Sequence, residues 1–206
     1  MELIESKSLL AKLMATENLI VEQRQVATAM FDVKNRILTL PILDNDISGY
    51  LYDLLCGHEV GHALYTPEEG IRKALELKLP MSLMNVLEDS RIERKIKTKY
   101  PGIRASFVRG YSELIAKDFF GTAGVDMNTL NFIDRVNLFC KGGPTQGIKF
   151  NEEETSLLKE IESTQTYDDV IELGIRIGKF MKDQAEEARS RPQETISAWP
   201  IMVVSP

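Results

Sequence analysis

The sequence is organised around SGYLYDLLCGHEVGHALYT, residues 48–66. This stretch predicts one helix, and at about 100° per residue His58 and His62 lie on nearly the same face of it. Glu59 lies about a quarter-turn away, beside the pair of histidines. Gly61 has no side chain, which predicts that another element approaches this face closely. The chain contains no histidines besides these two.

His58, Glu59 and His62 form the pattern H-E-x-x-H, which is typical of zinc peptidases. Two neutral imidazoles one helical turn apart can bind one metal ion, and a carboxylate beside them can take a proton from a metal-bound water. The pattern is short and also occurs on ordinary amphipathic helices, where a histidine packs in the core. A third protein ligand is therefore needed to decide between a metal site and a packed helix face.

A second helix, predicted over residues 81–98, supplies the candidate for that third ligand. Glu88 falls in the middle of an apolar arc of this helix, with apolar residues one turn away on either side. An ionised carboxylate in such a stripe is costly unless it is paired or bound to a metal. Glu88 is therefore predicted to complete a His-His-Glu zinc site with one position open for water. The alternative is a salt bridge from Glu88 to an arginine such as Arg91 or Arg104.

The other polar residues near this candidate site have different expected roles. Asp89 lies at the edge of the apolar stripe, and we expect it to hold an imidazole through its other nitrogen. Glu93 and the basic residues around it are interpreted as a solvent-exposed face. A donor for an oxyanion is also needed, and Tyr65, Arg109 and Tyr111 stay open as candidates.

Length and composition set limits on the class of protein. The chain has 206 residues, of which 43% are hydrophobic and 27% charged, as in ordinary globular proteins. A net charge of −6 argues against nucleic-acid binding. No apolar run reaches the ~18 residues of a membrane span, and the N-terminus lacks a signal-peptide core. Two cysteines, Cys56 and Cys140, form no disulfide framework, which favours a reducing cytoplasm.

The pattern of apolar residues and turn signals predicts a mostly helical α+β fold with a short β-hairpin. The hairpin is expected within 26–42, with a turn at Lys34-Asn35, and Pro41 should mark an edge strand or the point where the chain leaves the sheet. Helices are expected at 4–16, 48–66, 68–78, 81–98, 103–120, 129–140, 152–163 and 167–189. The expected division is a metal-binding domain over 1–120, a helical extension packed on it over 121–190, and a tail over 191–206.

Two segments together carry a resemblance to a known family. HEVGHALYTP, residues 58–67, and NVLEDSRIERKI, residues 85–96, resemble the peptidase-like proteins of tailed phages. Those proteins are related to the cobaltochelatase subunit that carries a von Willebrand factor A domain. The wider similarity is to gluzincins, zinc peptidases with two histidines on one helix and a glutamate from a following helix. The resemblance extends over residues 1 to about 180.

The resemblance implies a small zincin-like domain that acts as a zinc-dependent endopeptidase. By position it gives His58 and His62 as zinc ligands, Glu59 as the catalytic base and Glu88 as the third ligand. The substrate would be an extended polypeptide that pairs with a strand of the hairpin. The same resemblance implies an AAA+ ATPase as a partner and the cytoplasm of a host cell as the location.

A departure from the family leaves a second class of function open. Relatives of this kind usually continue into a von Willebrand factor A domain, whose Asp-x-Ser-x-Ser pattern does not occur in this chain. The alternative is a catalytically silent metal-binding module that serves interaction or assembly. A purely structural site has no use for Glu59 and is normally closed by four ligands, so an intact Glu59 favours catalysis.

Overall fold

The computed structural model describes residues 19–26, 28–42 and 48–189. Its helices and one small sheet confirm the predicted class, a mostly helical α+β fold. The helix expected at 4–16 and the tail expected from 191 lie outside the described residues. Within the described residues, no helix is long and apolar enough to cross a membrane.

The sheet has three strands in the order β1-β3-β2. Its strands are β1 (Ile20–Arg24), β2 (Met30–Asp32) and β3 (Ile37–Pro41). β2 and β3 pair antiparallel, which confirms the hairpin, and the Asn35 backbone N–H donates to Asp32 across the turn at 2.8 Å. β1 pairs parallel to β3 on its other side. Each of the two edges of the sheet is therefore formed by a strand other than β3.

Pro41 does not lie on an edge strand, but it marks the point where the chain leaves the sheet, which is the second of the two predicted possibilities. Pro41 is the last residue of the central strand, and β2 does not reach it, because β2 begins at Met30 opposite Thr39. On the other side the backbone N–H of Ile42 donates to the carbonyl of Arg24 at 2.9 Å. Pro41 has no backbone N–H, but it stands where neither neighbouring strand needs one from it.

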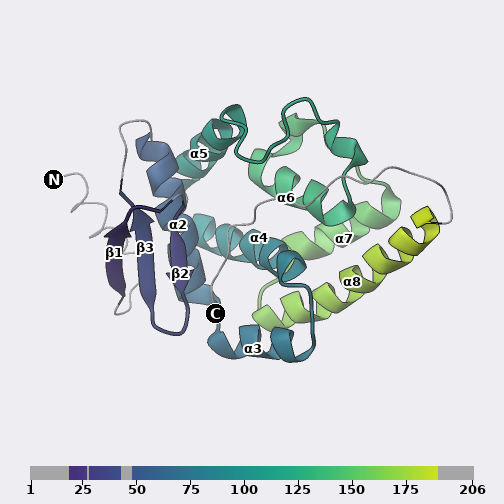
Figure 1. The fold of residues 1–206 in the computed structure, drawn as a ribbon, viewed down its shortest axis with the longest axis horizontal. Helices are drawn as coiled ribbons and strands as arrows, with labels where there is room; N and C mark the ends of the chain where they lie inside the picture. Colours follow the sequence, from purple (N-terminus) through teal and green to yellow (C-terminus); the bar gives the residue numbers. More distant parts are fainter. Residues whose placement is uncertain (1–18, 27, 43–47, 190–206) are drawn as a thin grey trace.

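The helices of the described residues lie on one side of the sheet (Figure 1). They are α2 (Gly49–Tyr65), α3 (Glu68–Glu76), α4 (Met81–Lys99), α5 (Arg104–Ala116), α6 (Phe132–Gly142), α7 (Glu152–Ser163) and α8 (Tyr167–Arg189). Short 3-10 helices lie at η1 (Pro101–Ile103), η2 (Met127–Thr129) and η3 (Pro144–Gln146). α2 contacts strands β2 and β3, and it also contacts α4 and α5.

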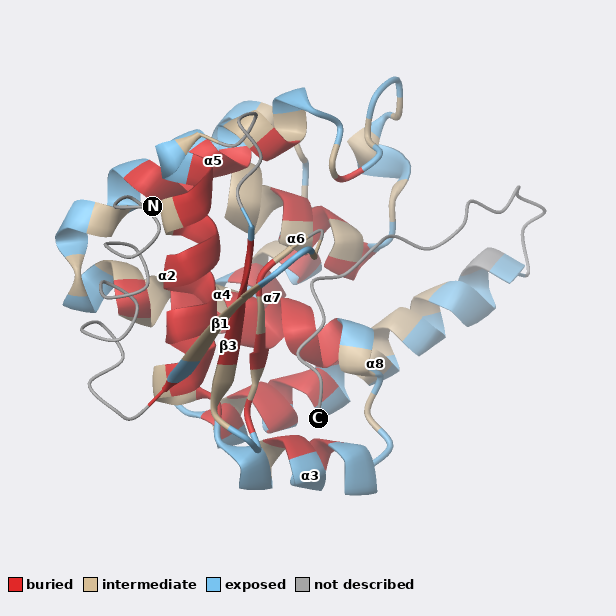
Figure 2. Ribbon diagram, turned by 60° about the vertical axis from the view of Figure 1, so that its left-hand side comes forward, coloured by how far each residue is buried: buried red, intermediate tan, exposed pale blue. Residues whose placement is uncertain are grey.

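α4 crosses the middle of the molecule and joins its two halves. It contacts α2 and α3 as well as α6, α7 and α8, so the helices of the expected extension pack directly on it. Figure 2 shows that α2 and α4 form the most buried part of the ribbon. Gly61 allows the close crossing of these two helices, since a Cβ there would lie 2.8 Å from Cδ1 of Ile92. The close approach expected at Gly61 is confirmed.

Local capping fixes where several helices begin. Ser48 caps α2 by accepting a bond from the Leu51 N–H at 3.1 Å. Asn151 and Glu154 form a capping box at the start of α7. The Asp169 N–H donates to the Thr166 hydroxyl at 3.1 Å, and the Asp169 carboxylate accepts from the Thr166 N–H at 2.9 Å. These reciprocal bonds begin α7 and α8 at the positions expected from the sequence.

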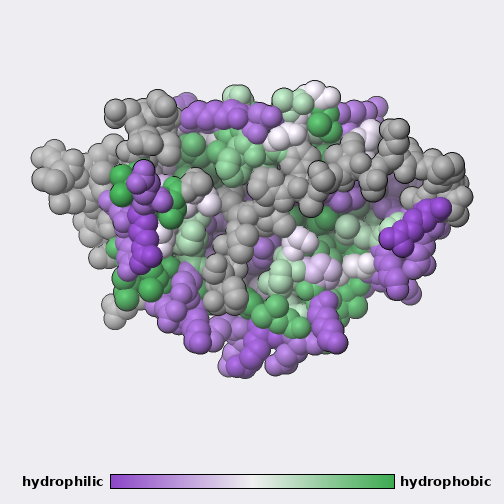
Figure 3. Space-filling view, viewed as in Figure 1, coloured by the Kyte–Doolittle hydropathy of each residue, from purple (hydrophilic) through white to green (hydrophobic). Residues whose placement is uncertain are grey.

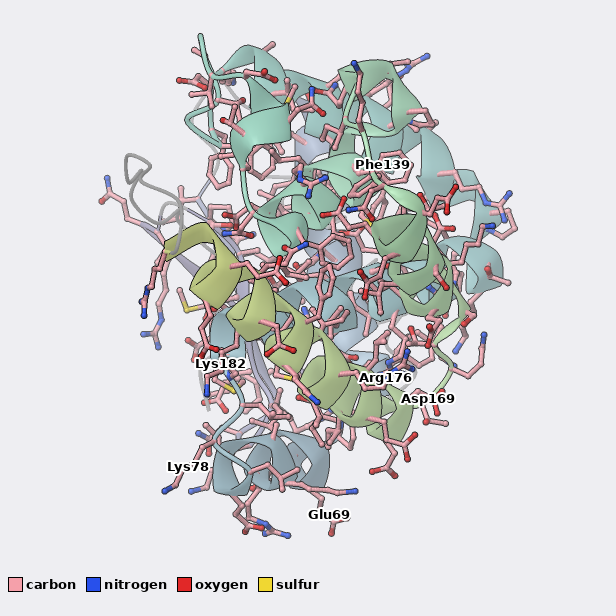
Figure 4. The ribbon with its side chains drawn as sticks, turned by 90° about the vertical axis from the view of Figure 1, so that its right-hand side faces the viewer. Glu69, Lys78, Phe139, Asp169, Arg176 and Lys182 are labelled. Carbon is pink, nitrogen blue, oxygen red and sulfur yellow. The ribbon has the colours of Figure 1, made fainter. Side chains whose placement is uncertain are left out.

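The outer helices present charged residues to solvent. α3 forms the lower rim of the molecule in Figure 1, and hydrophilic side chains dominate that rim in Figure 3. Figure 4 shows α8 crossing one side, with Asp169 near its start and Lys182 near its other end, and α3 below it. Arg176 of α8 binds Glu160 of α7 through two bonds on this surface. Charged side chains are ordinary on such a surface. At the buried crossing of α2 and α4, in contrast, ionisable side chains are unusual and need an explanation.

Candidate metal centre

The two histidines of α2 lie side by side in the interior. His58 is 2% exposed and His62 is 1% exposed, and their Nε2 atoms are 3.3 Å apart. Their rings meet at an interplanar angle of 74°. Their positions one turn apart on a helix that is packed on several sides place both imidazoles at the crossing with α4. The side-by-side arrangement predicted for His58 and His62 is confirmed.

Asp89 of α4 supplies the third polar group at this crossing. Its Oδ1 atom lies 3.2 Å from Nε2 of His62 and 3.6 Å from Nε2 of His58. The ligands of a tetrahedral zinc ion at bond lengths of about 2.0–2.1 Å are separated by about 3.3 Å. The three atoms therefore have the mutual spacing of three corners of a metal site, and these residues could hold a metal ion.

The structure places Glu88 outside this group, and we correct the expectation that it lies beside the histidines. Its carboxylate accepts two bonds from Arg91, from Nε and Nη2, at 2.7 Å each. It also accepts a bond from the Thr66 hydroxyl at 2.5 Å. This is the salt bridge to an arginine that the sequence left as the alternative.

Asp89 rather than Glu88 faces the histidines of α2, and the sequence pattern could not show this because α4 is surrounded on nearly all sides. Every residue from Leu83 to Asp89 is buried, so the apolar arc that singled out Glu88 is not the only buried face of the helix. Successive residues of a helix differ by about 100° in direction. The neighbouring carboxylates therefore point to different sides, and the contacts of α4 decide which of them faces α2.

Hydrogen bonds to the far side of each imidazole fix which nitrogen carries the proton. Nδ1 of His58 lies 3.1 Å from Oε1 of Glu93, a carboxylate whose pKa is lowered by His58 and Lys97 although burial opposes this. An ionised carboxylate has no proton to give, so Nδ1 of His58 is the donor. Its Nε2 atom is then free to bind a metal ion, as in other carboxylate–histidine pairs at metal sites.

The second imidazole is oriented by Thr66 and Glu88. Nδ1 of His62 lies 3.0 Å from the Thr66 hydroxyl, whose proton is donated to Glu88. The hydroxyl therefore accepts from Nδ1, and Nε2 of His62 is free on the side of Asp89. Glu88 thus acts on the histidine through Thr66.

We expect Thr66→Val to weaken zinc binding by ~10–100-fold, the usual loss when a group that orients a ligand is removed. Valine has nearly the shape of threonine but cannot accept the bond from Nδ1 of His62. Zinc titration by calorimetry against a competing chelator would measure the change. Ser163→Ala, which removes an exposed hydroxyl bonded only to the Glu160 carbonyl, serves as the control and should bind zinc as the wild type does. Equal affinity of Thr66→Val and wild type would contradict the role of this bond.

The charges around the group favour a cation at its centre. Burial alone would lower the pKa of His58, but Asp89, Glu93 and Glu59 raise it to about 9. Burial opposes the ionisation of Asp89, yet His58, Lys141 and His62 hold its pKa well below the usual range. A proton on His58 balances the carboxylates in the metal-free protein, and a metal ion can take the place of that proton.

Glu59 lies beside the group without being one of its three converging residues. It is 3% exposed, and burial raises the pKa of its carboxyl, while the charges of the histidines and a hydrogen bond from the Phe31 backbone counteract this. Phe31 belongs to β2, so the sheet helps to place Glu59. A carboxyl with a raised pKa that is positioned next to a metal site is suited to accept a proton near neutral pH.

Several residues that build this centre were missed in the sequence or given other roles. Glu93 and Arg91 are 3% and 2% exposed, so the interpretation of both as part of a solvent-exposed face is wrong. Lys141, from α6, lies 3.2 Å from Oδ2 of Asp89. The spacing of Glu93, four residues after Asp89 on one helix face, is the signal that a projection could have used.

Two of the three candidate oxyanion donors bind other residues. Tyr111 is buried and donates its hydroxyl to Glu93, behind His58. Arg109 of α5 binds the exposed Tyr50 of α2. The contacts of Tyr65 involve its backbone carbonyl, which accepts from Arg91 at 2.7 Å, and its ring, over which Lys95 lies, so its hydroxyl stays open as a candidate.

Two cavities formed by the described residues lie near the centre, and neither has His58, His62 or Asp89 in its wall. One of about 540 Å³, between α5 and the end of α6, has Tyr111 and Lys141 in its wall. Another of about 420 Å³ has Thr66 and Arg91 in its wall. Both therefore reach residues that bond to the candidate metal-binding group rather than the group itself.

Comparisons with models of protein families, with curated proteins and with solved structures found no match. The chemistry of the group itself is therefore what bears on function.

Proposed function

We propose that this protein is a zinc-dependent endopeptidase, with His58, His62 and Asp89 as ligands. The observation that carries the proposal is the convergence of two Nε2 atoms and one carboxylate oxygen, with a further buried carboxylate beside them. Two histidines and one carboxylate are the ligand set of a zinc site that keeps a position open. Zinc held there supplies Lewis-acid chemistry, in that it lowers the pKa of water and polarises a carbonyl. Asp89 replaces the Glu88 of the sequence-based prediction in this proposal.

Glu59 is the general base in this reaction. It would accept the proton of the attacking water and pass it to the nitrogen of the leaving amine. Its burial suits this role, because a raised pKa brings the carboxyl closer to neutrality. The resemblance to gluzincins supports the same role for the glutamate of the H-E-x-x-H pattern.

The substrate is an extended polypeptide that pairs with β2. Among the described residues β2 pairs with β3 alone, so its other edge can offer backbone groups to a further strand. The hydrogen bond from the Phe31 backbone to Glu59 supports the choice of β2 over β1, since it joins this strand to the proposed base. An AAA+ ATPase as partner, and the cytoplasm of a host cell as location, rest on the resemblance to phage proteins.

A specific observation favours a second candidate, a silent metal-binding module for interaction or assembly. The side chains at the centre are only 1–4% exposed, and the two cavities described above do not have them among their lining residues. These residues are His58, Glu59, His62 and Asp89. A site used for catalysis must admit substrate, whereas a site that only ties α2 to α4 need not.

Removal and return of the metal tests the proposed function. We expect protein purified without chelator to contain zinc by mass spectrometry and to cleave an unstructured protein. A strong chelator should abolish cleavage, and added Zn²⁺ should restore it. Cleavage that persists without metal would contradict the proposal, and bound zinc with no cleavage would favour the silent module.

A further inference from the structure

The carboxylate of Asp89 has two oxygens with different partners. Oδ1 faces the Nε2 atoms of His58 and His62, at 3.6 and 3.2 Å. Oδ2 faces Nζ of Lys141, at 3.2 Å. The bond to Lys141 occupies one lone pair of Oδ2 and draws this oxygen toward α6, so turning both oxygens toward one point would strain that bond.

Lys141 is held in place by its surroundings. It lies in the last turn of α6, and its side chain is 6% exposed. Its ammonium group lies 5.9 Å from the centre of the Tyr111 ring and 5.9 Å from that of the Phe120 ring. Contacts of this kind favour a cation over an aromatic face. Two aromatic rings and Asp89 therefore all lie within reach of the Lys141 ammonium group.

The number of oxygens that Asp89 presents sets the coordination number of a bound metal. Two imidazoles, one carboxylate oxygen and one water make a four-coordinate, tetrahedral zinc site. If both oxygens of Asp89 bound the ion and the water stayed, the site would be five-coordinate. A four-coordinate site with one position for water therefore requires that one oxygen be kept away.

We propose that Lys141 is a positioning residue that restrains Asp89 to bind a metal through Oδ1 alone. The inference rests on the proposed metal centre, but it does not depend on peptidase activity. Through Lys141, helix α6 of the expected helical extension would then help to determine how the metal is bound. The competing explanation is that the lysine only ties α6 to α4, as an ordinary buried ion pair.

Cobalt spectroscopy separates these explanations. Co²⁺ replaces zinc in such sites, and five-coordinate Co²⁺ absorbs visible light more weakly than four-coordinate Co²⁺. We expect Lys141→Met to lower the intensity of the visible bands, because Asp89 then binds through both oxygens while the water stays. Lys141→Arg, which keeps the charge and the donors, should restore much of the wild-type spectrum. Identical spectra for wild type and Lys141→Met would overturn the inference.

Arg135→Met is the matched control, because Arg135 is a buried cation of the same helix whose partner is Glu154, away from the centre. This variant should lose stability and keep the wild-type cobalt spectrum. An equal spectral change in Arg135→Met and Lys141→Met would show general loosening of α6 and would overturn the inference.

A second measurement uses only the wild-type protein. The infrared difference between metal-free and zinc-loaded protein with ¹³C-labelled aspartate reports how a carboxylate binds. A wide separation of its two stretching bands is expected for binding through one oxygen, and a narrow one would overturn the inference. A wild type that takes up neither Co²⁺ nor Zn²⁺ would overturn the metal centre itself, which is a different result from metal uptake with an unchanged Lys141→Met spectrum.

Discussion

Replacing Glu59 with glutamine should lower the rate of peptide cleavage by at least ~10²–10⁴-fold, the contribution typical of a general base. Glutamine keeps the size of the side chain and can bond to polar neighbours, but it cannot accept the proton of water. Burial already disfavours the charged form of Glu59, so loss of the charge should cost little stability. Zinc binding should survive, because Glu59 is not among the three converging residues.

The measurement combines zinc titration with cleavage of an unstructured protein by wild type and Glu59→Gln at equal zinc loading. Glu160→Gln is the control, since it alters a surface carboxylate of α7 that binds only Arg176. It should cleave at the wild-type rate. Equal cleavage by wild type and Glu59→Gln would remove the proposed mechanism.

Replacing Asp89 with alanine should abolish zinc binding, whereas Glu88→Ala should keep zinc with a loss of ~10–100-fold in affinity. The first change removes a ligand atom. The second removes the partner of Thr66, which orients His62. Glu88→Ala should also destabilise the fold by ~3–5 kcal/mol, because Arg91 would be left buried without its carboxylate.

Metal content by mass spectrometry and unfolding in denaturant would measure both effects. The two variants are neighbours on one helix, so each controls for general damage to α4. If Glu88→Ala abolished zinc binding while Asp89→Ala bound it normally, the ligand expected from the sequence would be the right one.

The helices were predictable because their signals are local. The Asn151–Glu154 box begins α7 where the spacing of two residues predicts it, and Ser48, the first residue of the stretch that predicts α2, caps that helix. The hairpin of β2 and β3 follows from one tight turn. The parallel pairing of β1 with β3 has no such signal, because it joins residues 17 apart in the register Ile20↔Ile37. That pairing makes β3 central and leaves β1 and β2 as the edge strands.

The site was predictable where one helix determines it and not where two helices meet. His58, Glu59 and His62 belong to one turn of α2, so their relative directions follow from the helix alone. The choice between Glu88 and Asp89 depends on how α4 is rotated against α2. Periodicity could not decide this, because α4 is buried nearly all round. Lys141 comes from a third helix, and no spacing in the sequence links it to Asp89.

The buried crossing of α2 and α4 gathers one more carboxylate than cation when both histidines are neutral. The buried carboxylates are Glu59, Glu88, Asp89 and Glu93, and their cationic partners are Arg91, Lys141 and Lys97, of which the Lys97 side chain is 30% exposed. In the metal-free protein a proton on His58 balances this difference, and a metal ion can take the place of that proton. Binding to the folded state alone is thermodynamically linked to folding, and an ion at 100 times its Kd adds about 2.7 kcal/mol to the free energy of unfolding. Because binding and folding are linked, the proposed metal centre would also stabilise the fold, and it would do so only when the metal ion is bound.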